Sequence, residues 1–120
     1  ESPTRIETVF LEDQDASIGA TDMTDGTLPA GTYSLTWFAT VVRSAGATST
    51  LTVTIDFTYR GNAKSRSYPA MTANTIATIS QDGGLIIVDA GSPVRYSTTY
   101  GSTGVPTMLY DLELVLQRSA

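Results

Sequence analysis

The sequence predicts an all-β protein, an antiparallel β-sandwich of the jelly-roll kind with eight to nine strands. Residues 50–59 alternate large apolar with small polar side chains without exception. Because successive side chains of a strand point to opposite faces, Leu51, Val53 and Ile55 must share one dry face. Turn residues recur at intervals of about ten residues, which is the spacing of sandwiches and barrels. No segment of useful length has helical periodicity.

The same alternation defines strands near both ends of the chain. Strands are expected at residues 5–11, 16–20, 32–42, 49–59, 63–68, 75–80, 84–89, 94–100 and 107–118. We expect residues 43–48 to join the two longest strands as a hairpin, and residues 81–84 to form a second hairpin turn. An immunoglobulin-like sandwich is the alternative fold, although the chain lacks the cysteine pair that flanks a buried Trp in that family.

Composition narrows the classes of function. The 120 residues suit one domain, and 32 of them are Ser or Thr. A net charge of −5 disfavours nucleic acid as a partner, because phosphate binding needs a basic stripe. The absence of Cys and His excludes disulfides, thiol nucleophiles, His-based triads and zinc sites of ordinary composition. We therefore expect no cofactor and no metal.

The N-terminal region is set apart by its charge. Seven of the twelve acidic residues lie within the first 25 positions. We expect residues 1–15 to form an acidic arm and residues 16–120 to form the sandwich. The strand-like part of this arm is a candidate tether that pairs with an exposed sheet edge of a neighbour. The candidate tether residues are Ile6, Val9, Phe10 and Leu11.

Acidic and aromatic residues offer three weak candidate sites. Asp111 and Glu113 face the same way on one strand. A solvated strand face is a simpler interpretation of this pair than the active site of a two-carboxylate glycosidase. Residues 12–19 resemble the opening of a calcium loop but lack its later ligands. Four aromatic residues form either a sugar-stacking platform or part of the core. These residues are Trp37, Tyr96, Tyr100 and Tyr110.

Large apolar residues also occur on the polar faces of two expected strands. Phe38, Val42, Leu109 and Val115 are a candidate surface for self-association or for a partner. We expect a homotrimer or another closed oligomer. The longest apolar run, residues 85–88, is far too short to span a membrane, so we expect no membrane span.

The order of elements resembles a known type of protein. Its segments are Gly31-Thr-Tyr-Ser-Leu-Thr-Trp-Phe38, residues 49–58, Ala90-Gly-Ser-Pro-Val-Arg-Tyr-Ser-Thr-Thr-Tyr100 and Tyr110-Asp-Leu-Glu-Leu-Val-Leu116. This pattern, over residues 16–118, is similar to β-rich domains of tailed-bacteriophage virions, found in head decoration, head-fibre and tail-fibre or baseplate proteins. The resemblance implies a structural role in the virion, commonly as a homotrimer, and carries no catalytic residues.

Three functions remain open from the sequence. The first is a virion structural protein, a capsid decoration or head-fibre knob that is assembled in the host cytoplasm and contacts the major capsid protein or another virion protein. The second is a receptor-binding domain of a tail fibre or baseplate, or a carbohydrate-binding sandwich that contacts a host-surface glycan. The third is a glycan hydrolase that uses two carboxylates; the sequence favours a protein that is not an enzyme.

Overall fold

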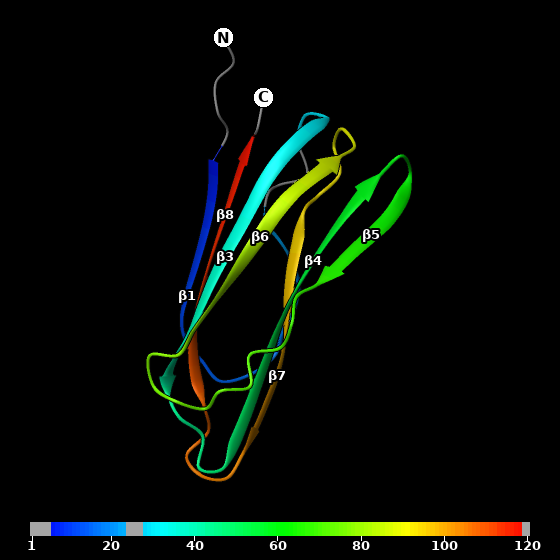
Figure 1. Ribbon diagram of the computed structural model, residues 1–120. Coiled ribbons are helices and arrows are strands. Elements are labelled where there is room, and N and C mark those ends of the chain that lie inside the picture. The colour runs from blue at the N-terminus through cyan, green and yellow to red at the C-terminus, as the bar shows by residue number, and fades with distance from the viewer. Residues whose placement is uncertain (1–5, 24–27, 119–120) are drawn as a thin grey trace.

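The fold consists of two antiparallel sheets of four strands each. A computed structural model describes residues 6–23 and 28–118, except for the side chain of Ile6. Sheet A has the strand order β1-β8-β3-β6, and sheet B has the order β2-β7-β4-β5 (Figure 1). The strands are β1 (Ile6–Gln14), β2 (Ile18–Asp22), β3 (Gly31–Arg43), β4 (Thr48–Tyr59), β5 (Asn62–Ser67), β6 (Ile79–Val88), β7 (Arg95–Thr103) and β8 (Leu109–Arg118). The described residues contain no helix that is long and apolar enough to cross a membrane.

The strand order confirms the predicted jelly-roll sandwich. Strand β1 pairs with β8, β2 with β7, β3 with β6 and β4 with β5, so the chain is one long hairpin rolled into two sheets. The immunoglobulin-like alternative places several consecutive strands side by side in one sheet. Here β4 and β5 are the one consecutive pair that shares a sheet among the described strands.

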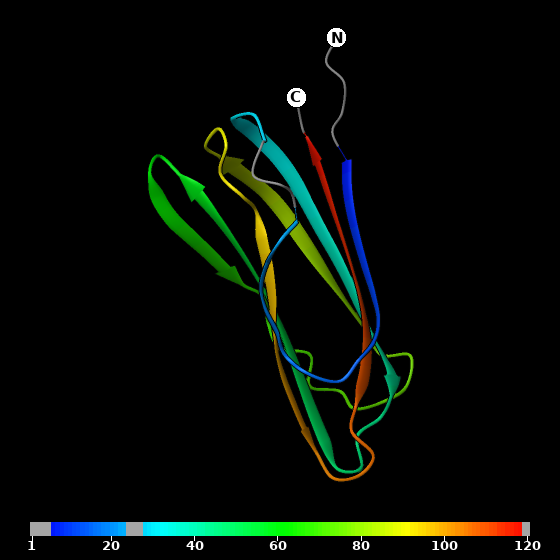
Figure 2. The ribbon, with the colours of Figure 1, turned by 180° about the vertical axis from the view of Figure 1, so that it is seen from behind.

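The inner faces of both sheets supply one core. Figure 2 shows the two sheets from behind. Leu112, Leu114 and Leu116 of β8 and Leu51, Val53 and Ile55 of β4 are all at most 2% exposed and belong to the same cluster. The apolar faces of β4 and β8 therefore line a common core. The aromatic members of this core include Tyr33, Trp37, Tyr96 and Tyr110.

A hydroxyl network inside the core ties the two sheets together. The buried Tyr110 hydroxyl on β8 lies 2.8 Å from Thr98 Oγ1 on β7 and donates to the Ala16 carbonyl. Thr98 Oγ1 in turn accepts the backbone N–H of Ile18 at the start of β2. Burial raises the pKa of Tyr110 above its usual value, so the phenol stays protonated and can donate. Every group of this network has a partner, as buried polar groups require.

Two expected turns are not hairpins in the structure. Residues 43–48 connect β3 in sheet A to β4 in sheet B, so the two longest strands lie in opposite sheets. Residues 81–84 lie inside the continuous strand β6, which replaces the two expected strands at 75–80 and 84–89. A Cβ at Gly83 would lie 2.4 Å from the Leu35 carbonyl oxygen on β3. Glycine at this position thus permits close strand contact rather than a turn.

The expected boundary between an arm and the sandwich is also corrected. Residues 6–14 form β1, which is hydrogen-bonded to β8 and is an edge strand of sheet A. Val9 and Leu11 are half-buried and pack against the core, because they face inward opposite Leu114 and Leu112. Phe10 points outward and is 55% exposed. The other part of the expected arm, residues 1–5, lies outside the described residues.

Truncation of the core should be costly. Ile55→Ala removes a side chain that is 1% exposed, and we expect it to lower the free energy of unfolding by about 2–5 kcal/mol through lost burial and a cavity. Denaturant titration followed by circular dichroism measures this change. Thr99→Ala on the exposed face of β7 is the control and should change stability by less than about 0.5 kcal/mol. An equally small effect of Ile55→Ala would contradict the core assignment.

The hydroxyl network gives a second prediction. Tyr110→Phe keeps the ring but leaves Thr98 and the Ala16 carbonyl with one partner fewer. We expect a loss of about 1–3 kcal/mol in unfolding free energy, the cost of leaving buried polar groups unpaired. Thermal and denaturant unfolding of the two proteins measure it. Tyr33→Phe is the comparison variant. It removes a hydroxyl that donates to a single carbonyl, that of Pro29, and should lower the unfolding free energy by less.

Candidate functional site

The outward face of sheet A contains the four residues predicted to form a partner surface. Phe38 and Val42 lie on β3, and Leu109 and Val115 lie on the adjacent strand β8. The pairing of Phe38 with Glu113 and of Thr36 with Val115 places the Phe38 and Val115 side chains on neighbouring rows of one face. Phe38, Leu109 and Val115 are half-buried, whereas Val42 is exposed.

Strands β1 and β6 extend this surface with residues that sequence reasoning did not assign to it. Leu85, Ile79 and Ile87 on β6 are 69%, 57% and 46% exposed. We call the complete set the apolar face; it consists of Phe10, Phe38, Val42, Ile79, Leu85, Ile87, Leu109 and Val115. The sequence contained a signal for the outward apolar residues of β6, namely the apolar run at residues 85–88. An apolar run without alternation predicts a strand that is covered on both faces.

Asp111 and Glu113 lie within the apolar face rather than across a groove. Glu113 is exposed between Phe10 and Phe38 in the strand register. Asp111 Oδ1 accepts the backbone N–H of Asp13, so this carboxylate holds the end of β1. The two side chains therefore share one open face of one strand, and they do not flank a space for a sugar as the hydrolase mechanism requires.

The predicted aromatic platform is part of the core. Trp37, Tyr96 and Tyr110 are at most 5% exposed. Tyr100 is half-buried and its hydroxyl donates to the Met108 carbonyl. A sugar cannot stack on rings that are covered by the opposite sheet, so these residues supply packing energy rather than a binding surface.

The acidic segment before β2 is used for backbone contacts. The Ser17 hydroxyl accepts the backbone N–H of Tyr100, and Asp13 has a left-handed backbone with φ of 54°. Within residues 6–23 and 28–118, no three acidic side chains gather in a way that could hold a metal ion. The resemblance to a calcium loop therefore has no structural counterpart in this part of the chain.

A groove lies on the opposite side of the molecule, on the outward face of sheet B. It has a volume of about 330 Å³ and lies between the β4–β5 hairpin, strand β2 and the start of β7. The hairpin groove, as we call it, is lined by Ala20, Asp56, Phe57, Thr58, Ala63, Lys64, Ser65, Pro93 and Arg95. Asp56 is opposite Ser65 on one side and opposite Arg95 on the other, so the three side chains form one row across three strands.

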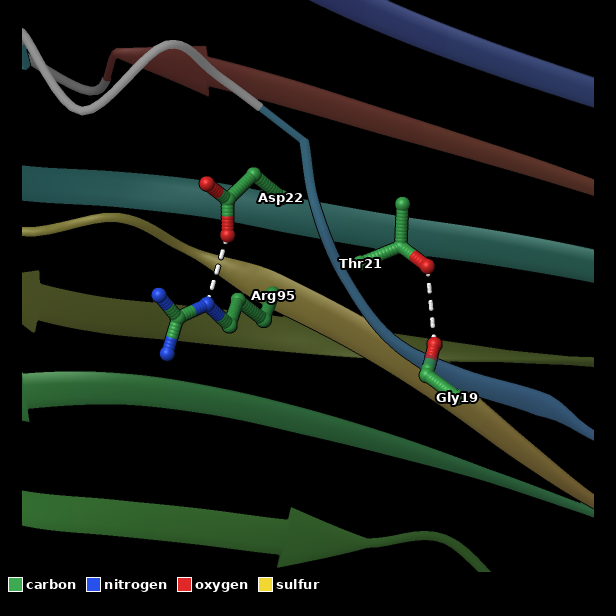
Figure 3. Close-up of polar contacts among 4 residues, drawn as sticks. All are labelled: Gly19, Thr21, Asp22 and Arg95. Carbon is green, nitrogen blue, oxygen red and sulfur yellow. Dashed lines mark hydrogen bonds and ion pairs between the residues drawn. The ribbon is translucent and has the colours of Figure 1, made fainter.

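Arg95 is held in place at one end of this row. Its Nε donates to Asp22 Oδ1 on β2, and both side chains are about half exposed (Figure 3). In the same view the Thr21 hydroxyl donates to the Gly19 carbonyl and stabilises the short strand β2. No described residue pairs with the two terminal nitrogens of Arg95, so that edge of the guanidinium can donate to another group.

The hairpin that walls the groove is fixed by Asp89. One carboxylate oxygen accepts the backbone N–H of Arg60 and the other accepts that of Gly61, both at 2.8 Å. Arg60 and Gly61 have φ angles of 53° and 76°, the left-handed pair of a type I′ hairpin turn. The Asp89 N–H also donates to the Thr58 carbonyl. Asp89, which follows β6, therefore ties the end of sheet A to the hairpin of sheet B.

No protein-family model matches the chain, and no curated protein matches it. The described residues offer two candidate surfaces, the apolar face of sheet A and the hairpin groove of sheet B. Sequence reasoning missed the groove because no local motif contains Asp56, Ser65 and Arg95. The pairing register of three strands brings them together.

The Asp89 contacts give a pH-dependent prediction. The two backbone N–H donors hold the pKa of Asp89 below its usual value of 3.8. A carboxyl with a lowered pKa in the folded state stabilises the fold above its unfolded pKa, and this contribution is lost as the pH falls through the folded pKa. We therefore expect Asp89→Asn to be less stable than the parent at neutral pH, with the difference shrinking below about pH 4.

Thermal unfolding of both proteins between neutral and acidic pH measures this difference. Asp82→Asn is the matched control, because Asp82 is an exposed carboxylate that accepts the N–H of its own neighbour, Gly83, and does not hold the hairpin. A stability difference for Asp89→Asn that stays constant across the acidic range would contradict the role of the charged carboxylate.

Proposed function

We propose that this protein is a structural component of a tailed-bacteriophage virion, a capsid-decorating or knob domain that self-associates through its apolar face. The observation that carries the proposal is the set of large aliphatic side chains on the outward side of sheet A. A monomer would leave Leu85, Ile79 and Ile87 in water, and a sheet face with several large exposed aliphatic side chains marks an interaction site.

The edges of the two sheets support the same conclusion. Exposed edge strands are normally blunted by charge, bulges or short length. Strand β5 carries Lys64 and Arg66, β2 has five residues and an irregular register, and β1 has a register shift beside acidic residues. Strand β6 has ten residues with one charged side chain, Asp82, and three exposed aliphatic ones. We infer that β6 is the edge that a second copy covers.

A homotrimer is the assembly that fits the distribution of these residues. The exposed aliphatic side chains of β6 and the exposed ring of Phe10 on β1 lie at opposite edges of sheet A, with Glu113 between them. A contact that joins the β6 edge of one copy to the β1–β8 side of the next is heterologous, and a heterologous contact builds a ring when the rotation between copies closes. Three copies are the smallest such ring, and the ring turns sheet B outward.

The virion context comes from the resemblance of the strand pattern to phage head decoration and fibre-knob domains. A chain without Cys, with a surface rich in hydroxyl groups, suits a particle that meets changing redox conditions. In this proposal the trimer is assembled in the host cytoplasm and attaches to the major capsid protein or another virion protein. It is a structural part of the particle and not an enzyme.

Self-association through sheet A gives a direct test. We expect the parent protein to sediment as a trimer at tens of micromolar, and Leu85→Asp to shift it to monomer, because a buried unpaired carboxylate would oppose the contact. Leu85 is 69% exposed, so the fold should survive the change. Thr99→Asp, on the outward face of sheet B, is the matched control and should stay trimeric.

Two results would overturn the assembly. A parent protein that sediments as a pure monomer would remove the basis for a ring, and a Leu85→Asp variant that remains trimeric would place the contact elsewhere. The virion role is tested separately by mass spectrometry of purified particles that encode the chain. The proposal expects a fixed number of copies per particle, and their absence from the particle would contradict it.

A further inference from the structure

We propose that the hairpin groove on the outward face of sheet B is a binding site for a neutral saccharide residue. The proposal rests on the lining of the groove and does not depend on the assembly of the protein. The groove volume of about 330 Å³ is at the lower end of the range for small-ligand sites. It therefore accommodates one sugar ring rather than a larger cofactor.

The polar side chains of the groove match the hydroxyl groups of a sugar. The side-chain oxygen atoms of Asp56, Thr58 and Ser65 make no hydrogen bond within the described part of the chain. Hydroxyl groups of a saccharide are both donors and acceptors, so they can donate to the Asp56 carboxylate and accept from the free edge of Arg95. Charge-assisted hydrogen bonds of this kind are the strong ones.

Apolar groups in the same groove suit the C–H face of a sugar ring. Ala20, Ala63 and Pro93 line the groove between the polar side chains. Small side chains at these positions leave room for the ring. Specific small-molecule sites generally combine such apolar surface with a few placed polar groups.

The charged side chains in and beside the groove are two carboxylates, Asp22 and Asp56, and two cations, Lys64 and Arg95, so their charges balance and favour a neutral ligand. The cation of Arg95 is already paired with Asp22, and Asp56 lies directly opposite Arg95 in the next strand. An anionic sugar that approached the Arg95 guanidinium would therefore meet two carboxylates. A neutral sugar uses the same carboxylates as hydrogen-bond acceptors and meets no like charge.

The wall of the groove is fixed before any ligand binds. The Asp89 carboxylate holds the turn of the β4–β5 hairpin through two backbone N–H groups, and Arg95 is oriented by Asp22. Groups that are already ordered lose little conformational freedom on binding, which favours affinity.

The experiment is a titration of the isotopically labelled full chain, followed by amide NMR. The probes are the methyl glycosides of glucose, galactose, mannose and N-acetylglucosamine. We expect at least one of them to shift the amides of Asp56, Ser65 and Arg95 in a saturable manner, with a millimolar dissociation constant. Asp56→Asn should weaken that binding about tenfold, since it removes a charged acceptor.

Thr99→Ala is the matched control, because Thr99 lies on the same outward face of sheet B but outside the groove, and its binding should equal that of the parent. Three outcomes would overturn the proposal. They are no saturable shift with any of the four glycosides, saturation with glucuronate or N-acetylneuraminate alone, and unchanged binding by a folded Asp56→Asn variant. None of these depends on whether the protein is a trimer, so the groove and the assembly are tested independently.

Discussion

The position of β8 between β1 and β3 is the constraint on which the rest of the structure depends. This last strand pairs with both neighbours along nearly its whole length, and its inner side chains Leu112, Leu114 and Leu116 are at most 1% exposed. Tyr110 on the same strand links the core of sheet A to β7 and β2 through hydroxyl bonds. Because β1 and β3 do not touch except through β8, sheet A is complete only when the two ends of the chain meet. Contacts between such distant segments are costly in loop entropy, and the extensive burial on β8 offsets that cost.

The outward faces of the two sheets differ although the same alternation generates both. The inner positions of β3, β4 and β8 are under the same demand, since each must fill the core. The outer positions are free of that demand, so their composition reflects what each face contacts. Sheet B presents Thr50, Thr99 and the Asp22–Arg95 ion pair to solvent, whereas sheet A presents Leu85 and Ile87. The fold does not require aliphatic side chains at these outer positions, and this is why we propose an assembly contact at sheet A.

Local pattern was sufficient to predict most strands and the core, but not how strands are distributed between sheets. Alternation identifies β3, β4 and β8 because each has one fully buried face. It cannot show whether the short connection at residues 43–48 returns in the same sheet or crosses to the other one, since both arrangements keep the same residues inside. Gly83 and Gly84 were misread as a turn because the close contact of Gly83 with Leu35 depends on a strand distant in sequence. The groove was missed for the same reason, and four apolar-face residues were found because they break the polar alternation of their own strands.

Asp89 connects the two surfaces that we assign to function. It follows β6, the strand whose outer side carries Ile79, Leu85 and Ile87 of the apolar face, and its carboxylate holds the turn of the β4–β5 hairpin. If sheet A is covered by other copies, sheet B and its groove face away from the contact, since the two sheets lie back to back across one core. The jelly-roll order thus places the proposed assembly face and the proposed ligand groove on opposite sheets. All residues of β5 are exposed, so this strand does not pack against the core. The hairpin is instead held by Asp89, in the loop that crosses from β6 in sheet A to β7 in sheet B.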